Sequence, residues 1–361
     1  MANIQNGTSF CSPLEPISRL TEVGGSSENI NDISIEVKNI YKNYYSNNSG
    51  KFAGIGKSAF ADRNSSVPLQ ESGISFSVQR GEIFGIIGPD GAGKTTLFRI
   101  LTTLILANTG TAIVDGFDVV NDYKEIRKRV GYMPGKFSLY QDLTVEENLD
   151  FFATVFNTTV EENYELIKDI YQQIEPFKNR RAGKLSGGMK QKLALSCALI
   201  HKPSVLFLDE PTTGVDPVSR KEFWGMLKNL KAQGITILVS TPYMDEASLC
   251  DRIALIQNGQ FLKIDTPKNI VSQYENKLWA VQSDNMYKLL TDLRANELTK
   301  NCFAFGDKIH ISSQLNPSEG DLKTFDIEKI QNTLSNNGHN NIVIREIEPT
   351  IEDCFMQLSQ K

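Results

Sequence analysis

Cysteine and histidine are scarce in this 361-residue chain. It has five cysteines, none in a C-x-x-C pair, and three scattered histidines. An odd number of widely spaced cysteines argues against a disulfide framework or a zinc site and favours a reducing, cytoplasmic compartment. With 40% hydrophobic and 22% charged residues, the composition is that of a soluble globular protein.

Long apolar runs and an excess of basic residues are also missing. No run reaches the ~18 apolar residues that span a bilayer, so any membrane part would have to come from a partner. Residues 1–31 are polar, and we interpret them as a flexible tail, not a secretory signal. The net charge of -5 argues against a nucleic-acid partner.

Short apolar runs alternate with helical patterns from Ile74 to about Gln273. Continuous runs of strand length are typical of a parallel sheet that is covered on both faces. They lie at Ile83–Ile87, Val205–Leu208 and Ile235–Val239. Ile33–Val37 alternates as a half-buried strand does. One buried helix face is predicted by the spacing of Leu97, Ile100, Leu101 and Leu104.

These patterns predict three regions: the tail at 1–31, a main domain at 32–274 and an accessory domain at 275–361. The main domain would contain a loop insertion rich in Ser, Asn, Gly and Ala at 46–66. It would also contain a helical subdomain at about 136–184. The accessory domain mixes strand and helix patterns, which predicts a small α+β fold. The expected elements are strands Leu278–Gln282, Lys308–Ser312 and Asn341–Ile347, and helices Met286–Leu293 and Ile327–Asn336.

The strongest motif follows the first apolar run. It fits G-x-x-x-x-G-K-[ST], whose glycines let backbone N–H groups and a helix N-terminus form a cradle for anions. Lys94 would add a charge on the β- and γ-phosphates, and the Thr95 hydroxyl would bind Mg²⁺. A glycine-rich turn without a ligand is the alternative, but the strand before and the amphipathic helix after favour a phosphate site. The predicted ATP-binding residues are Gly88, Pro89, Asp90, Gly91, Ala92, Gly93, Lys94, Thr95 and Thr96.

A second apolar run, Val205–Leu208, ends in Asp209 and Glu210. An acid at the carboxyl end of a buried strand beside a phosphate loop is suited to Mg²⁺ binding, which we assign to Asp209. Glu210 would polarise the attacking water as a general base. Strands often end in an acid, so this pattern gains its specificity from the loop upstream.

Small residues stand between these two motifs, in Leu185-Ser186-Gly187-Gly188-Met189-Lys190-Gln191. They would let backbone amides approach an anion at a helix N-terminus. The simpler alternative is a helix cap, for which Ser186 is well suited.

In order and spacing, the three motifs resemble those of the ABC ATPases, whose signature LSGGQ or LSGGM lies between the phosphate loop and the Walker B strand. The resemblance covers roughly 33–273. It implies an α/β P-loop NTPase cassette with a RecA-like parallel sheet core, an antiparallel β subdomain and a helical subdomain, followed here by the accessory domain. It implies ATP and Mg²⁺ as ligands, a catalytic Glu210, and metal binding by Thr95 and Asp209.

In ABC ATPases two cassettes stack head to tail, and each ATP lies between the phosphate loop of one and the signature of the other. The resemblance therefore implies that Ser186, Gly187 and Gly188 contact ATP bound to a second cassette, in a homodimer or a heterodimer. Tyr44 resembles the aromatic residue that stacks on adenine, with a packed tyrosine as the alternative. Gly214-Val215-Asp216-Pro217 resembles the loop that touches the partner cassette.

Three more stretches resemble ABC-2-type exporters: Glu348–Phe355, Leu139–Val145 and Tyr243–Ala247. They imply the ATPase subunit of such an exporter, held at the cytoplasmic face of the membrane by a permease that docks around Tyr132–Leu143. Taken singly, each stretch is also explained by helix capping or packing. The alternative function is a soluble regulatory or scaffold ABC protein without a transport role.

Two residues expected from the resemblance are missing. Gly135 stands where the family usually has a glutamine near Mg²⁺ and the attacking water, and Pro242 stands where a histidine contacts the γ-phosphate. Losing one preorganised donor costs about 10²–10³ in rate. We hypothesise that this chain hydrolyses ATP slowly at its own site and completes a competent site on a different cassette. A working homodimer, with water held by other groups, is the alternative.

Overall fold

The computed structural model describes residues 32–44, 53–55, 73–135, 139–313 and 327–360. Ile33–Lys361 forms one unit by its internal contacts. The predicted tail at 1–31 lies outside the described residues, as does the predicted insertion at 46–66 except for one short strand. In the described part of the chain, no helix is both long enough and apolar enough to cross a membrane.

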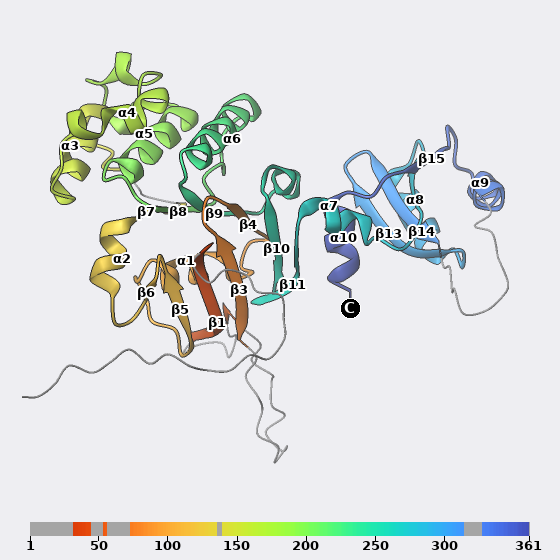
Figure 1. Cartoon of the computed structure of the whole chain (residues 1–361). Helices are drawn as coiled ribbons and strands as arrows, with labels where there is room; N and C mark the ends of the chain where they lie inside the picture. The colour runs from red at the N-terminus through yellow and green to blue at the C-terminus, as the bar shows by residue number, and fades with distance from the viewer. Residues whose placement is uncertain (1–31, 45–52, 56–72, 136–138, 314–326, 361) are drawn as a thin grey trace, which may run out of the picture. The chain divides into compact units, whose positions relative to one another are not determined.

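A six-stranded sheet forms the centre of the nucleotide-binding part. Five of its strands are parallel and one edge strand is antiparallel. In spatial order they are β11 (Gln260–Asp265), β10 (Arg252–Gln257), β4 (Ile83–Ile87), β9 (Thr236–Thr241), β8 (Val205–Asp209) and β7 (Val130–Met133). The predicted parallel core is confirmed. Because β4, β9 and β8 are parallel neighbours, their carboxyl ends meet at one edge of the sheet (Figure 1).

A second, antiparallel sheet pairs strands from the beginning of the chain. Its order is β2-β1-β5-β6, and β3 pairs with the other side of β1. The strands are β1 (Ile33–Tyr44), β2 (Ala53–Ile55), β3 (Ile74–Gln79), β5 (Thr109–Val114) and β6 (Phe117–Asp118). The first strand extends well beyond the predicted Ile33–Val37, and β2 falls inside the predicted insertion.

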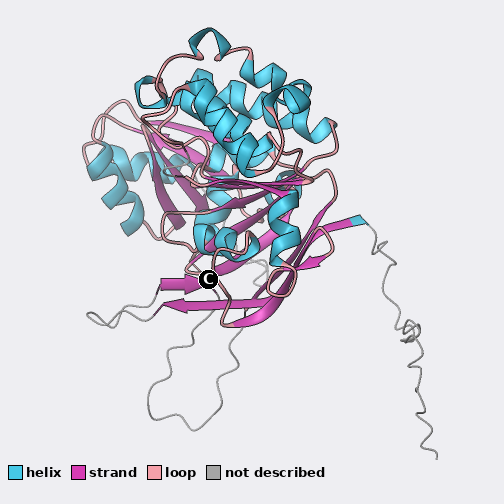
Figure 2. Ribbon diagram, turned by 90° about the vertical axis from the view of Figure 1, so that its left-hand side faces the viewer, coloured by secondary structure: helices cyan, strands magenta, loops and turns pink. Residues whose placement is uncertain are grey.

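Helices cover the six-stranded sheet, as Figure 2 shows with helices in cyan and strands in magenta. The α-helices are α1 (Lys94–Leu101), α2 (Tyr123–Arg129), α3 (Val145–Val155), α4 (Val160–Tyr171), α5 (Gly187–Leu199), α6 (Pro217–Ala232) and α7 (Pro267–Ser272). Short 3-10 helices add η2 (Glu175–Phe177), η3 (Ala182–Lys184) and η4 (Met244–Leu249). Capping boxes at Thr144 and Thr159 begin α3 and α4.

One prediction for α1 was wrong. Leu97, Ile100 and Leu101 are buried as expected, but Leu104 is 54% exposed. The helix ends at Leu101, and Thr103 adopts a left-handed φ of 62°, which turns the chain away before Leu104.

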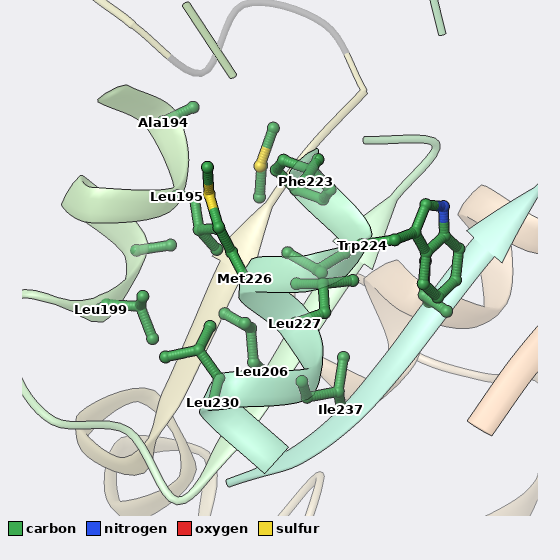
Figure 3. Packing of buried hydrophobic residues seen from close by; sticks show 14 of the residues in the cluster. Ala194, Leu195, Leu199, Leu206, Phe223, Trp224, Met226, Leu227, Leu230 and Ile237 are labelled. Atoms are coloured by element: carbon green, nitrogen blue, oxygen red, sulfur yellow. The ribbon is translucent and has the colours of Figure 1, made fainter. Parts of the chain in front are cut away.

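Helices α5 and α6 pack on each other and on the sheet. Figure 3 shows side chains from both helices meeting around residues of β8 and β9. They include Leu195, Leu199, Phe223, Leu227, Leu230, Leu206 and Ile237, all in one buried cluster. The helix that begins in the signature is therefore fixed to α6.

The C-terminal region has its own sheet, of order β13-β14-β12-β15, in which all pairs are antiparallel. The element sequence is βαββαβ, a split βαβ arrangement. It comprises β12 (Leu278–Gln282), α8 (Met286–Ala295), β13 (Thr299–Phe305), β14 (Lys308–Ser313), α9 (Ile327–Asn336) and β15 (Val343–Ile347). The predicted α+β character is confirmed, and the boundary at 275 stays a prediction.

The last helix, α10 (Ile351–Leu358), packs with the nucleotide-binding part. Its Ile351, Cys354 and Phe355 belong to the same buried cluster as Leu206 and the other residues around α5 and α6. Cys354 Sγ lies 3.7 Å from the carbonyl oxygen of Ile270 on α7. The chain thus leaves for the C-terminal sheet and returns.

Candidate nucleotide-binding site

The phosphate loop joins β4 to α1, and its glycines are needed for two reasons, backbone conformation and space. Gly91 and Gly93 have φ of 79° and 103°, in the left-handed region that favours glycine. Gly88 is needed for space, because a Cβ there would lie 2.1 Å from the carbonyl oxygen of Ile256 on β10. Pro89, Asp90 and Gly91 form the exposed tip of the loop.

Lys94 is the centre of the site. Its side chain is 3% exposed, and Nζ donates to the carbonyl oxygens of Gly88 at 2.8 Å and Pro89 at 3.0 Å. The same Nζ lies 3.1 Å from Oε1 of Glu210. A buried ammonium group requires such partners. Thr95 and Thr96 follow in the first turn of α1, half-buried.

The two acids lie where β8 ends. Asp209 is buried, and its Oδ1 accepts a 2.7 Å hydrogen bond from Ser240 Oγ on β9. Glu210 has a left-handed φ of 51°, uncommon for a residue other than glycine. The structure therefore brings Lys94, Asp209 and Glu210 to one edge of the sheet, although more than 100 residues separate the lysine from the acids.

The oxygen donors at this edge fit magnesium. Mg²⁺ in nucleotide sites is usually held through one or two carboxylates together with substrate phosphates. Asp209 would supply the carboxylate and Thr95 the hydroxyl. Substrate phosphates would complete the coordination. No group of three or more His, Cys, Asp or Glu side chains suited to a metal occurs in the described ranges.

The signature begins α5. Ser186 caps the helix by accepting a 3.4 Å hydrogen bond from the Met189 N–H, as the simpler alternative expects. Its contact with ATP bound to a second cassette stays a prediction. A Cβ on Gly188 would lie 2.6 Å from Ser219 Oγ on α6, and one on Gly187 would lie 3.2 Å from the Gly214 carbonyl oxygen. The signature glycines therefore allow close packing against α6 and the loop before it.

The loop before α6 is held by Asp216. Its carboxylate accepts hydrogen bonds from the N–H groups of Val218 at 3.1 Å and Ser219 at 3.0 Å. The Ser219 bonds hold the pKa of Asp216 below its ordinary value. Signature, loop and α6 start are thus one packed corner.

Comparison with known proteins is consistent with this geometry. Residues 72–213 match the family described as ABC transporter. Over 311 residues the chain is 32% identical to the Nod factor export ATP-binding protein I of Rhizobium sp. (strain N33). This match covers 85% of this chain and 95% of that protein.

The chain belongs to the ABC transporter ATP-binding family, a family of ATPases. It is also 42% identical over 205 residues to a probable multidrug ABC transporter ATP-binding protein of Escherichia coli (strain K12), a match that covers 56% of this chain and 36% of that protein. The chain thus spans little more than a third of that relative.

Solved structures show the same fold. The ATP-binding subunit of an ABC transporter superimposes with a TM-score of 0.55 and 25% identity, over 66% of this chain and 92% of that one. A dimeric ATP-binding cassette in a post-hydrolysis state, bound to ADP and Pi, gives a TM-score of 0.54 with 22% identity, over 64% and 98%. The predicted ABC cassette fold is confirmed.

In this ABC cassette, both unusual positions lie beside the acids or the strand next to them. A Cβ on Gly135 would lie 2.9 Å from the Asp209 carbonyl oxygen and 3.7 Å from Glu210 Cβ. Pro242 follows the last residue of β9. The N–H of Tyr243 donates to Thr241 Oγ1 at 3.1 Å, and the Arg220 guanidinium lies 4.1 Å from the centre of the Tyr243 ring.

Tyr44, the predicted adenine contact, ends β1 and is 38% exposed. Lys42 Nζ lies 5.5 Å from the centre of its ring. An exposed ring suits stacking better than a packed tyrosine would, and the adenine contact stays a prediction.

Sequence reasoning missed two residues near the site. Ser240 hydrogen-bonds Asp209, and Arg220 lies 3.6 Å from the buried carboxylate of Glu246 as well as over Tyr243. A signal existed only for Ser240, in its place two residues before the expected histidine.

Proposed function

We propose that this cassette binds ATP with Mg²⁺ and hydrolyses it as the energising subunit of an ABC-2-type exporter. It would work on the cytoplasmic face of the membrane, with a permease and a second cassette. The observation that carries the nucleotide site is the convergence of Lys94 with Glu210 at 3.1 Å, beside Asp209. The exporter class rests on the resemblance of the chain and on the names of its relatives.

ATP entry would give Lys94 new acceptors. The β- and γ-phosphate oxygens would replace some of its present contacts, and Glu210 would be freed to act on water. Charge-assisted hydrogen bonds contribute about 1.5–3 kcal/mol each, so Lys94→Ala should weaken ATP binding by about 100-fold or more. Titration with a fluorescent ATP analogue measures this. Lys228→Ala, which removes an exposed lysine on α6, is the matched control.

We also propose that the cassette's own hydrolytic site is weakened. Position 135 adjoins both acids but carries no side chain, and position 242 offers neither a side-chain donor nor an N–H. The neighbouring Tyr243 is held by Thr241 and Arg220. The signature, which would serve the partner's ATP, is complete at Ser186, Gly187 and Gly188.

The test compares turnover of the chain alone with turnover beside its partner cassette. Slow hydrolysis alone and faster hydrolysis with the partner are expected. Pro242→His should raise the solitary rate, whereas Gly135→Gln should raise it less because its Cβ would crowd the Asp209 carbonyl at 2.9 Å. Brisk hydrolysis by the unaltered chain alone, abolished by Glu210→Gln, would sink the weakened-site proposal.

A groove of about 670 Å³ supports the permease contact. It is lined by residues of α2, α3, α5 and β7 and of the segment that follows α1. Its lining includes Tyr132, Leu139, Tyr140, Phe152 and Phe156. Leu104 and Val155 on its rim are exposed. An apolar groove of this kind suits one face of an amphipathic helix, which we assign to a cytoplasmic segment of the permease.

Exposed rim residues allow a test that spares the fold. Leu104→Glu with Val155→Glu should abolish copurification with a multi-spanning membrane protein from solubilised membranes and leave ATP binding intact. Lys228→Glu adds a similar charge elsewhere and should not disturb the complex. If the unaltered chain binds ATP but copurifies with no membrane protein, the result contradicts the exporter role and favours the regulatory or scaffold function.

A further inference from the structure

Ser240 lies on β9, outside the phosphate loop, the signature and the strand that ends in the acids. It is fully buried near the end of β9, between β4 and β8. Its Cα pairs with Ile86 on the strand that leads into the phosphate loop and with Asp209 on the strand that carries the acids. One side chain therefore lies between the two halves of the site.

The Ser240 hydroxyl contacts both acidic residues. It donates to Asp209 Oδ1 at 2.7 Å and accepts from the backbone N–H of Glu210 at 3.0 Å. The Ser240 carbonyl oxygen accepts from the same N–H at 3.1 Å. A hydroxyl has a single proton, and here it is committed to the Asp209 carboxylate.

The bond to Asp209 has a consequence for a cation. The bond to Ser240 restricts rotation of the carboxylate, and Oδ2 would be the oxygen left for an ion. Partners that hydrogen-bond a metal-binding carboxylate in this way orient it, and their removal typically costs about 10–100-fold in metal affinity or activity.

The bonds to Glu210 have a consequence for the base. Its left-handed backbone, at φ 51°, diverts the chain from the line of β8. Two acceptors on Ser240 hold its N–H in that turn, and the turned residue places Oε1 3.1 Å from Lys94 Nζ. A non-glycine residue in this conformation persists where its surroundings hold it.

We propose that Ser240 is a positioning residue of the ATP site, whose hydroxyl orients the Asp209 carboxylate toward Mg²⁺ and fixes the turn at Glu210. It acts through these two residues and touches neither nucleotide nor metal. The proposal rests on the proposed roles of Asp209 and Glu210 in binding Mg²⁺ and activating water.

The experiment measures binding, so that it does not depend on turnover. A fluorescent, non-hydrolysable ATP analogue is titrated into the full chain without metal and then over a series of MgCl₂ concentrations. Ser240→Ala should leave metal-free affinity unchanged and raise the MgCl₂ concentration for half-maximal effect by about 10-fold. In a separate assay with ATP itself, the hydrolysis rate at saturating MgCl₂ should also fall, because the Glu210 turn is loosened.

Matched variants separate positioning from packing. Ser196→Ala removes an equally buried hydroxyl whose hydrogen bond goes to its own helix, at the Lys192 carbonyl oxygen, and should not shift the MgCl₂ curve. Ser240→Thr keeps the hydroxyl and should restore much of the Mg²⁺ response. If Ser240→Ala does not fold, Ser240→Cys keeps a side chain of similar size with a weaker donor and should give a smaller shift in the same direction.

The outcomes distinguish the two levels of the argument. An unaltered chain that binds no nucleotide overturns the proposed function itself. An unaltered chain that binds nucleotide in a Mg²⁺-dependent way, together with folded Ser240 variants whose MgCl₂ curves match it, overturns the Ser240 proposal alone.

Discussion

The phosphate loop and the start of the signature helix both contain closely spaced glycines, but the glycines serve different purposes. In the loop, Gly91 and Gly93 supply left-handed backbone, and the space around a Cβ on Gly91 is open. In the signature, Gly188 has a neighbouring side chain, Ser219, where a Cβ would go. Gly88 belongs to the phosphate loop, but like Gly188 it is needed for space, because the Ile256 backbone occupies the position that a Cβ would take.

Glycine is therefore required for backbone conformation at Gly91 and Gly93, and for close packing at Gly188. The loop owes much of its shape to its own backbone, so its geometry is local. The start of the signature helix owes its place to α6. Asp216 caps the N-terminus of α6, and the loop expected to touch the partner cassette leads into it. Movement of α6 would therefore carry the signature with it, whereas the phosphate loop would stay with β4.

The largest expected effect is that of Gly88→Ala. The new Cβ would meet the Ile256 carbonyl oxygen at 2.1 Å, and neither strand backbone gives way easily. We expect a loss of about 3 kcal/mol or more in the free energy of unfolding, with loss of ATP binding, measured by urea denaturation and nucleotide titration. Gly225→Ala, inside α6 with open space at its Cβ, is the control and should stabilise by about 0.5–1 kcal/mol. A variant at position 88 as stable as the unaltered chain would contradict the close packing.

Gly188→Ala should cost less, about 2 kcal/mol, since its obstacle is a short side chain. If contact with Ser219 causes the cost, Ser219→Gly should relieve part of it, giving a coupling of about 1 kcal/mol in a double-mutant cycle. Urea denaturation of the four proteins supplies the numbers. If the free-energy changes of the two substitutions simply add, contact with Ser219 is not the reason for glycine at position 188.

Gly91→Ala tests the conformational side of the comparison. Its Cβ would meet nothing, yet φ of 79° costs an alanine about 1 kcal/mol. Gly91→Asn should be milder, because asparagine tolerates this region better than alanine does. Stability from urea denaturation should rank glycine, asparagine, alanine; the reverse order would show that shape is not set by backbone preference.

The smallest effect concerns Asp216 and acid. Because hydrogen bonds from the Ser219 N–H lower its pKa, Asp216 contributes stability that is present above its unfolded pKa and lost as pH falls through the lower, folded pKa. Asp216→Asn keeps a helix cap without the charge. The melting temperatures of the two proteins should nearly agree at pH 7, and the unaltered chain should lose more between pH 5 and pH 2. If the melting temperatures of the two proteins fall in parallel across that range, the charge of Asp216 does not contribute to stability.

Continuous apolar runs gave reliable predictions. Ile83–Ile87 was predicted with its observed bounds, because five buried positions in a row are typical of a central parallel strand. Thr299–Phe305 was not predicted as a strand, because T-K-N-C-F-A-F shows neither a continuous run nor clean alternation. Leu104 fitted the helical spacing, but the spacing does not reveal where a left-handed residue ends the helix.

The residues of the site that belong to motifs were predictable from the sequence, and those that depend on strand register or helix packing were not. Lys94 and the two acids follow from motif order, and the structure brings them together as expected. The Ser240 bond joins residues 31 apart on different strands, and only the register of β8 against β9 creates it. For Gly188, the sequence suggested access for an anion, while its neighbour Ser219 became visible only once α5 and α6 were placed.

Because α10 packs on the nucleotide-binding part, the C-terminal sheet is an insertion before α10 and not a C-terminal extension. Its first strand enters at Leu278 and its last leaves at Ile347, and these two residues are paired neighbours, about 5 Å apart in such a pair. A short linker could therefore replace 278–347 and leave α10 in its seat. A chain ended at 277 would instead strip Ile351 and Phe355 from the buried cluster. To exchange this sheet between cassettes, the chain should be joined at the two paired strand ends, Leu278 and Ile347, and the receiving cassette should keep its own α10.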